Sequence, residues 1–242
     1  MPTSPLIQTV GELVRENPAR SRVFERLSID YCCGGKVPLR EACRGRGLDP
    51  ERVAADLAAV DDEPVESPDD PASMGLAALA DHIEATHHAL LREELPRLDV
   101  MTEKVAQVHG DAEPRLHDIR RVFVACREEL EAHMLKEERV LFPMIRELEQ
   151  ADGPVAFHCG SLANPIRMME HEHDSAGDAM ARFKELTDGY TPPEWACNTY
   201  RAMVDGLAAF ERDMHQHVHK ENNVLFPRAL ELEASRSAKG GA

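Results

Sequence analysis

Hydrophobic residues recur at three- and four-residue intervals over long stretches of the last two thirds of the chain. Leu76, Leu79 and Ile83 are one example, and this spacing is typical of the buried face of an amphipathic helix. Turn-forming residues separate four such segments, at residues 74–109, 114–149, 164–188 and 193–233. No run alternates apolar and polar residues long enough to predict a strand. The pattern therefore predicts an all-α protein whose larger part is a four-helix bundle.

The first sixty residues carry shorter apolar runs, which predict a separate small helical domain. Short helices are expected at residues 9–17, 19–27, 39–46 and 50–60. Thr9 and Glu12 have the spacing of a capping box, and Asp49 followed by Pro50 has the form of a helix start. The sequence YCCGGK, at residues 31–36, is expected to form a loop between these helices.

An acidic segment separates the two parts of the chain. DDEPVESPDDPAS has three prolines and six acidic residues and almost nothing to bury, which is typical of an exposed linker. We therefore predict a small helical domain at residues 1–60, a linker at 61–73 and the bundle at 74–235. The last residues, ASRSAKGGA, are expected to fray.

The composition of the 242-residue chain indicates a folded, acidic protein. Hydrophobic residues make up 43%, and 44 Asp and Glu against 28 Lys and Arg give a net charge of -16. That charge repels nucleic-acid backbones and anionic lipid head groups, so we expect neither nucleic acid nor a membrane as a partner. The chain begins without an apolar signal segment and has no apolar stretch approaching 18 residues, so a cytoplasmic location is expected.

One eleven-residue frame occurs twice, 84 positions apart. HMLKEERVLFP begins at His133 and HVHKENNVLFP begins at His217. In each frame a Glu follows the His by four residues, namely Glu137 and Glu221. Residues i and i+4 lie on one face of a helix, so each frame projects an imidazole and a carboxylate in the same direction.

Each frame is preceded by another His at a nearly equal offset. His88 lies 45 residues before His133, and His173 lies 44 residues before His217. The bundle is therefore interpreted as a duplicated pair of helices. Four imidazoles and two shared carboxylates in its core fit a dinuclear metal site, for which iron is suitable, although manganese and zinc accept the same ligands. His87 adjoins His88 and remains an alternative ligand.

The neighbours of these residues have expected roles as well. Leu141 and Leu225 should lie near the same helix face and cover the site, and Pro143 and Pro227 should bend the helices just beyond it. Glu138 is rotated by about 100° from Glu137 on an α-helix and should therefore point away from the proposed site. Outside the proposed ligands, the candidates for supporting contacts or an iron path are Glu129 and Glu172, and the ambiguous histidines are His87, His171 and His219.

The adjacent pair Cys32 and Cys33 is the only unusual cysteine spacing, and no CxxC motif is present. Two reduced, partly buried thiols without a function are one interpretation. The other is a redox or transient iron-handling role, because Lys36 and Arg40 should lower a thiolate pKa modestly and a disulfide between neighbours would be strained and easily reduced. The remaining cysteines are expected to be structural: Cys43, Cys126, Cys159 and Cys197.

The motifs HMLKEERVLFP, EHEHDSAG and HVHKENNVLFPRAL resemble the hemerythrin-like domain of the iron–sulfur cluster repair di-iron proteins, the repair of iron centres family. IDYCCGGK resembles the small cysteine-containing domain that precedes it in that family. The resemblance implies a hemerythrin-like four-helix bundle with two non-haem iron ions joined by an oxo or hydroxo bridge. The ligands it implies are His88, His133, Glu137, His173, His217 and Glu221. The family usually has one His after an aromatic residue where this chain has Thr86-His87-His88.

The resemblance also implies the repair of iron–sulfur clusters damaged by nitric oxide or peroxide, by supplying iron. The partners would be damaged iron–sulfur proteins, with NO or O2 as small ligands, and the protein would be a monomer or a homodimer. Two alternatives are an O2- or NO-binding sensor and an NO-reducing enzyme. Cys32 and Cys33 are expected to serve iron delivery or redox coupling, not assembly of the di-iron centre. Their loop would visit the bundle surface without belonging to it, across a linker spanning roughly 20 Å.

Overall fold

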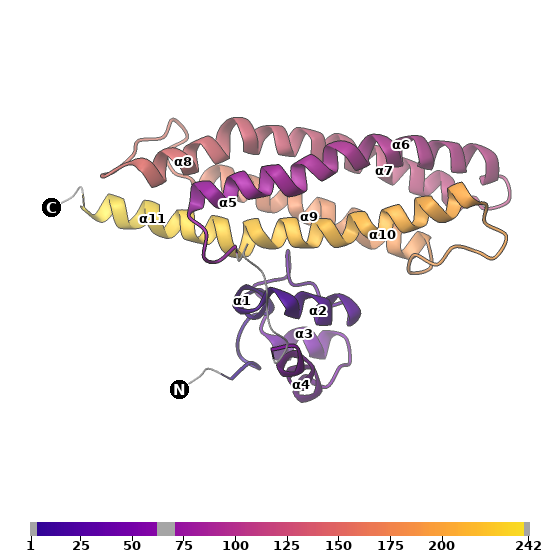
Figure 1. Ribbon diagram of the computed structural model, residues 1–242, viewed down its shortest axis with the longest axis horizontal. Coiled ribbons are helices and arrows are strands. Elements are labelled where there is room, and N and C mark those ends of the chain that lie inside the picture. The colour runs from indigo at the N-terminus through magenta and orange to yellow at the C-terminus, as the bar shows by residue number, and fades with distance from the viewer. Residues whose placement is uncertain (1–3, 62–70, 240–242) are drawn as a thin grey trace.

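The computed structural model describes residues 4–61 and 71–239, and all of its regular elements are helices. Within these residues, the only β contacts are the isolated bridges between Thr9 and Pro38 and between Phe157 and Gly160. The predicted all-α fold is therefore confirmed. Figure 1 shows long helical rods lying side by side, with a small helical unit against one side of them.

The small unit contains α1 (Val10–Glu16), α2 (Ser21–Arg26), α3 (Leu39–Gly45) and α4 (Pro50–Asp61). The capping box is present, because Thr9 Oγ1 accepts the Glu12 N–H at 3.2 Å and the Glu12 carboxylate accepts the Thr9 N–H at 2.9 Å. Leu13, Phe24 and Leu39 are fully buried in a core that belongs to this unit alone. The unit therefore has its own hydrophobic core.

The start of the predicted linker differs by one residue from the structure. Asp61 is the last residue of α4, and its carboxylate lies 2.6 Å from the guanidinium of Arg20. This ion pair holds the end of α4 against the turn before α2 and keeps the pKa of Asp61 below its usual value. Residues 62–70, which make up most of the predicted linker, lie outside the described part of the chain.

The bundle is built from four rods. The first is α5 (Leu76–Ile83), a π segment (Glu84–His88) and α6 (Ala89–His109). The second is α7 (Arg115–Lys136), a π segment (Glu137–Leu141) and α8 (Phe142–Gln150). The third is α9 (Ala163–Leu186), and the fourth is α10 (Asn198–His219), a π segment (Lys220–Leu225) and α11 (Phe226–Lys239).

The fourth rod corrects both ends of its predicted segment. It begins at Asn198, after the Pro-containing turn, and it continues to Lys239, so the expected fraying is wrong for residues 234–239, while residues 240–242 lie outside the described part of the chain. Tertiary contacts hold the last turns. The Glu233 carboxylate accepts hydrogen bonds from Ser161 and Leu162, and the Arg236 guanidinium donates to the Glu149 carbonyl at 3.1 Å.

The three π segments are a feature that helical periodicity did not predict. Two of them lie immediately before the Phe-Pro of the repeated frame, so Pro143 and Pro227 occupy the first turn of the next α-helix. A proline has no N–H to donate, and a wide turn removes the need for that hydrogen bond. The sequence predicted that these prolines bend the helices. In the structure, each proline is instead preceded by a π segment that contains a proposed bridging Glu.

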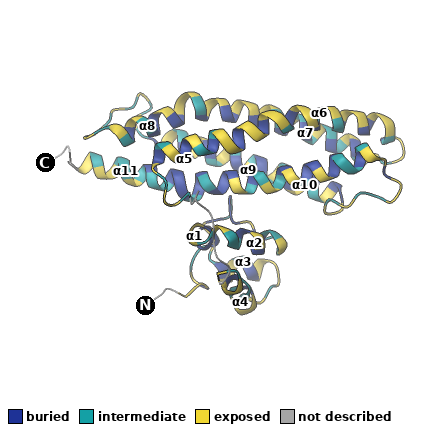
Figure 2. Ribbon diagram, in the orientation of Figure 1, coloured by how far each residue is buried: buried dark blue, intermediate teal, exposed yellow. Residues whose placement is uncertain are grey.

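Two apolar clusters fill the bundle on either side of its polar centre. One includes Leu91 and Leu130, and the other includes Ile83, Leu141 and Leu225. Leu141 and Leu225 are fully buried, as expected for residues that cover a site. Figure 2 shows the buried surfaces of the rods turned towards one another. The hydrophobic clusters thus enclose the level at which the His and Glu of each repeated frame enter the core.

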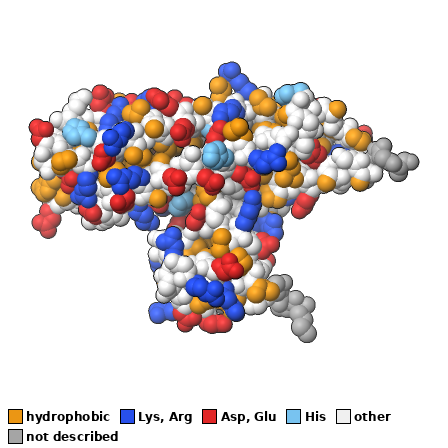
Figure 3. All heavy atoms as spheres, turned by 180° about the vertical axis from the view of Figure 1, so that it is seen from behind, with side chains coloured by type: hydrophobic (Ala, Val, Ile, Leu, Met, Phe, Trp, Pro, Cys, Tyr) orange, Lys and Arg blue, Asp and Glu red, His pale blue; other side chains and the backbone are white. Residues whose placement is uncertain are grey.

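Charged side chains cover the outside of the molecule. On the face seen in Figure 3, the described Lys and Arg side chains are interspersed with Asp and Glu. Among the described helices, none is long and apolar enough to cross a membrane.

Candidate metal centre

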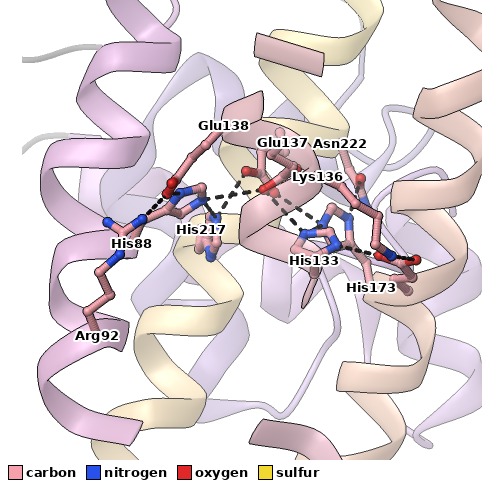
Figure 4. A network of polar contacts seen from close by, with 11 residues as sticks. His88, Arg92, His133, Lys136, Glu137, Glu138, His173, His217 and Asn222 are labelled. Carbon is pink, nitrogen blue, oxygen red and sulfur yellow. Dashed lines mark hydrogen bonds and ion pairs between the residues drawn. The ribbon is translucent and has the colours of Figure 1, made fainter. Parts of the chain in front are cut away.

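Six side chains from the four rods meet between the two apolar clusters. All six are at most 2% exposed: His88, His133, Glu137, His173, His217 and Glu221. Figure 4 shows the rings of the four histidines gathered around the Glu137 carboxylate. Their ligand atoms form two overlapping groups, and within each group these atoms lie within 4.8 Å of one another. The structure therefore brings together every residue of the predicted ligand set.

The first group contains His88 and His217, and the second contains His133 and His173. The Nε2 atoms are 3.2 Å apart in the first pair and 3.1 Å apart in the second. Glu137 and Glu221 belong to both groups. Two groups that share two carboxylates have the arrangement of a dinuclear site, with each Glu placed between two imidazole pairs.

Distances to the shared carboxylates are similar in the two groups. Glu137 Oε2 lies 3.3 Å from His88 Nε2 and 3.4 Å from His133 Nε2. Glu221 lies 3.0 Å from His217 Nε2 through Oε1, and 3.1 Å from His173 Nε2 through Oε2. Each Glu therefore faces one imidazole from each group.

Several polar atoms in this centre are buried without a hydrogen-bond partner. They are both carboxylate oxygens of Glu137, Oε2 of Glu221 and Nδ1 of His217. Burying unpaired carboxylate oxygens is unfavourable, because the interior does not replace their hydration. A cation bound between the carboxylates would satisfy them, so the residues present fit a metal centre.

The buried carboxylates and imidazoles of this centre shift one another's pKa values. Burial and the neighbouring Glu221 raise the pKa of Glu137 to about 8. Burial disfavours the Glu221 carboxylate too, but the adjacent His217 and His173 outweigh it and lower its pKa well below the usual value. Burial lowers the pKa of His173, and the two carboxylates more than compensate, raising it to about 9. A cation placed between the two carboxylates would balance their charges.

Three of the four imidazoles have a polar partner on their outer nitrogen. His88 Nδ1 lies 2.7 Å from Glu138 Oε1, and His133 Nδ1 lies 2.9 Å from Glu172 Oε2. His173 Nδ1 lies 2.8 Å from the Asn222 side-chain oxygen. An N–H donated outwards leaves the lone pair of Nε2 directed into the centre, which is the usual way of orienting a metal-binding imidazole.

Glu172 thus has the supporting contact that the sequence suggested, whereas Glu138 does not point away as expected. Glu138 contacts His88 and pairs with Arg92. The physical reason is the π segment that begins at Glu137, since its wider turn changes the directions of successive side chains. Glu172 also pairs with Lys136, and its hydrogen bonds to His133 and Lys136 lower its pKa to about 2.

The internal duplication extends to this outer layer. Glu138 and Asn222 occupy the same position of the two eleven-residue frames, and each contacts the Nδ1 of a His from another rod. Phe142 and Phe226 are likewise equivalent, and they stack on His88 and His173 with interplanar angles of 18° and 2°. The sequence signal that could have identified Glu138 and Asn222 is their equivalent position in the two frames.

His87, His171 and His219 lie outside the two groups. His87 Nδ1 is 2.8 Å from Asp213, its Nε2 is 2.7 Å from the Lys220 ammonium, and its ring stacks on His217. His171 is exposed, and His219 packs its ring against Tyr31. Of the two adjacent histidines, the structure therefore places His88 in the centre. Glu129 is exposed and lines a narrow recess together with His133 and Glu172.

The cysteine loop corrects one expectation, because it is docked on the bundle. Cys32 is 4% exposed and packs in the bundle's apolar cluster, and Cys33 Sγ lies 3.5 Å from the carbonyl oxygen of His173. The Asn223 side chain donates to the carbonyl oxygens of Tyr31 and Cys32 at 3.3 and 3.2 Å. The loop therefore contacts the rods at the level of the proposed ligands, rather than visiting their surface.

Gly35 explains why the loop can approach so closely. A Cβ at this position would lie 2.5 Å from Oδ1 of Asn223, which is too short for any side chain. The approach depends on a long-range pair of residues, Gly35 and Asn223, which no local pattern reveals.

The expected lowering of a thiolate pKa by Lys36 and Arg40 is not found at Cys32. Lys36 pairs with Glu170 of α9 at 2.8 Å, and Arg40 is exposed. The pKa of Cys32 is raised, because its hydrogen bond with Cys33, its burial and the nearby Asp30 all favour the neutral thiol.

We predict a graded role for Glu138. Replacing it with Ala removes the partner that orients His88, so metal affinity should fall by about 10- to 100-fold while binding is retained. Competition with a chelator would measure this change. Arg139→Ala is the matched control, since Arg139 is the next residue and is exposed. Equal affinities for the two variants would show that the contact does not orient His88.

Comparison with known proteins agrees with this centre. Residues 79–229 match the family described as Hemerythrin HHE cation binding domain, and residues 6–61 match a domain of unknown function named ScdA_N. The chain is 41% identical over 223 residues to the iron-sulfur cluster repair protein YtfE of Escherichia coli O157:H7, covering 92% of this chain and 96% of the relative. It is also 41% identical over 229 residues to YtfE of Pectobacterium carotovorum subsp. carotovorum, covering 93% and 98%.

Proposed function

This chain belongs to the family of the hemerythrin HHE cation binding domain, and we propose that it repairs damaged iron–sulfur clusters with iron held in its His–Glu centre. Its relatives over nearly the whole length are named iron-sulfur cluster repair proteins. The observation that carries the proposal is the pair of buried, shared carboxylates with unpartnered oxygens. A centre of this kind needs cations to be stable, and two groups of ligand atoms provide for two of them.

The residues would divide as follows. His88 and His217 would hold one ion, His133 and His173 would hold the other, and Glu137 and Glu221 would bridge them. Nitrogen and carboxylate ligands of this mixture suit non-haem iron. Bound iron would supply one-electron redox chemistry, and an iron ion could also be the cargo delivered to a damaged cluster.

The protein's own side chains supply orientation and exclusion of water. Glu138, Glu172 and Asn222 fix three of the imidazoles from outside. The apolar clusters on either side keep solvent away from the carboxylates. The clients would be iron–sulfur proteins damaged by nitric oxide or peroxide in the cytoplasm.

The repair proposal predicts transfer of iron together with recovery of a client. Iron-loaded protein is mixed without oxygen with a [4Fe–4S] dehydratase that nitric oxide has inactivated. We expect the dehydratase to regain activity while this protein loses iron, as measured by elemental analysis of the separated proteins. Arg139→Ala should behave like the parent, and the same amount of free ferrous iron should recover less activity.

The same experiment separates the alternatives. Reversible binding of NO or O2 with unchanged iron content and no recovery of the client would indicate a gas-binding sensor. Consumption of many equivalents of NO per protein, given an electron donor, would indicate an NO-reducing enzyme. Either result without recovery of the client would overturn the repair proposal.

A further inference from the structure

A second set of metal-binding side chains lies outside the bundle centre. Asp30, Cys32 and Cys33 each offer one ligand atom, and these atoms lie within 4.8 Å of one another. Both cysteines are free thiols. Their Sγ atoms are 3.9 Å apart, and Cys32 Sγ lies 3.1 Å from Asp30 Oδ1. Two sulfurs and a carboxylate oxygen therefore converge on one point.

The separation of the sulfurs matches that of two ligands on one ion. With metal–sulfur bonds of about 2.3 Å and a tetrahedral angle, two thiolates on one ion lie about 3.8 Å apart. The observed 3.9 Å needs almost no rearrangement of Cys32 and Cys33. The two cysteines are thus spaced for a shared cation while remaining unbonded to each other.

The loop that carries these groups is held in place before any ion arrives. The Asp30 carboxylate accepts the backbone N–H groups of Cys32 and Gly34, both at 2.9 Å, which fixes its orientation towards the sulfurs. From the other side, Asn223 binds the carbonyl oxygen of Cys32. Such restraint lowers the entropic cost of binding, because the ligand atoms are ordered in advance.

These three residues line a cleft of about 840 Å³ between the small unit and the rods α9 and α10. Six acidic side chains line it against three from Lys and Arg, so the cleft as a whole favours cations. The acidic residues are Glu25, Asp30, Asp174, Asp178, Glu185 and Glu211. The cleft is open to solvent on one side, where an ion could enter, and the cysteines form part of its wall.

We propose that Asp30, Cys32 and Cys33 form a separate site for one divalent cation. The chemical class is a borderline ion such as Fe²⁺, Co²⁺ or Zn²⁺, because thiolates exclude Mg²⁺ and Ca²⁺. Binding forms two metal–sulfur bonds and releases two thiol protons to solvent, with no change of oxidation state. A water molecule or a group from a partner completes the coordination.

Ferrous iron is the ion assigned to this site, and that assignment rests on the proposed function. Cys33 Sγ contacts the carbonyl oxygen of His173, whose ring belongs to the buried centre. An ion in the cleft would lie just outside the rod that carries this ligand. The site is therefore suited to holding iron in transit, whereas the buried centre is suited to retaining it.

Cobalt titration of the whole protein tests the site. Co²⁺ bound to thiolate absorbs in the near ultraviolet, which the His and Glu ligands of the bundle do not cause. We expect this absorption to saturate at about one equivalent of Co²⁺ per chain and to accompany the release of about two protons. The variant Cys32→Ser with Cys33→Ser should lose the absorption and keep the cobalt spectrum of the bundle, which also shows that the rods remain folded.

Two further variants make the test specific. Cys197→Ser removes an exposed thiol that does not line the cleft and should leave the titration unchanged. Asp30→Asn keeps an acceptor for the Cys32 N–H but removes the charge, and it should weaken cobalt binding at least tenfold while the sulfur absorption remains. Absorption that survives in the double cysteine variant, or that disappears in Cys197→Ser, would overturn the proposal, as would unchanged affinity in Asp30→Asn.

Competition with Fe²⁺ separates this inference from the proposed function. We expect ferrous iron to displace Co²⁺ from the thiolates under anaerobic conditions. If cobalt binds and ferrous iron fails to displace it, the assignment of iron is wrong although the site exists. If the site binds iron and the client dehydratase is still not repaired, the proposed function fails and the site stands.

Discussion

Replacing both Glu137 and Glu221 with Ala is expected to abolish metal binding in the bundle. Each carboxylate belongs to both groups of ligand atoms. One substitution therefore lowers the affinity for both ions, and the double substitution removes both bridging carboxylates. These variants are compared on the Cys32→Ser, Cys33→Ser background, which lacks the thiolate site; that background, loaded with iron under anaerobic conditions, should contain close to two iron ions per chain. The double variant should contain close to none, and each single variant should lose more metal than Glu138→Ala.

Elemental analysis and the absorption of the iron-loaded protein measure this result. Arg139→Ala is again the control, because it changes a charged residue in the same π segment without touching the centre. A parent value that stays near one ion, or a clear preference for zinc, would contradict two bridged irons. Loss of as much iron in Glu138→Ala as in Glu137→Ala would contradict the bridging role proposed for Glu137.

Removal of the metal is expected to lower the stability of the bundle by several kcal/mol. Without cations, Glu137 and Glu221 are neighbouring buried carboxylates, and one of them must take up a proton. A ligand that binds only the folded state at a thousand times its dissociation constant adds about 4 kcal/mol. The melting temperature of the bundle should therefore fall by several degrees in the metal-free protein.

Calorimetry of the loaded and metal-free forms measures this difference, and hydrogen exchange locates it. Protection should fall in the rods, whereas α1 to α4 should remain protected, because the small unit has its own core. The double variant Glu137→Ala with Glu221→Ala provides a control, since its midpoint should not respond to iron. Identical midpoints for the loaded and metal-free parent would show that the bundle does not depend on metal.

The fold and the candidate ligands could be predicted from the sequence because they follow from local helix geometry. A His and a Glu four residues apart share a helix face whatever the rest of the chain does, and the duplication supplied the two remaining histidines. The apolar spacing located the four rods for the same reason. Leu141 and Leu225 were placed correctly because they continue the face that starts at His133 and His217.

Other features were decided by contacts between segments distant in the chain. Glu138 contacts His88, from another rod, and the π segment turns it there, although an ideal helix directs it outwards. The last turns of α11 are held by Ser161, Leu162 and Glu149, so a polar tail that would fray alone remains helical.

The cysteine loop shows most clearly the difference between what the local sequence indicates and what tertiary contacts decide. Its sequence indicated two reactive thiols beside Lys36, whereas the fold pairs Lys36 with Glu170 and places Asp30 and Asn223 around the cysteines. The α-helical backbone repeats every 3.6 residues and so sets which positions share a face. The sequence alone therefore determined the rods and the six inward-facing candidate ligands. Docking is set by shape and charge on surfaces that meet only after folding, so tertiary structure alone decided what surrounds Cys32 and Cys33.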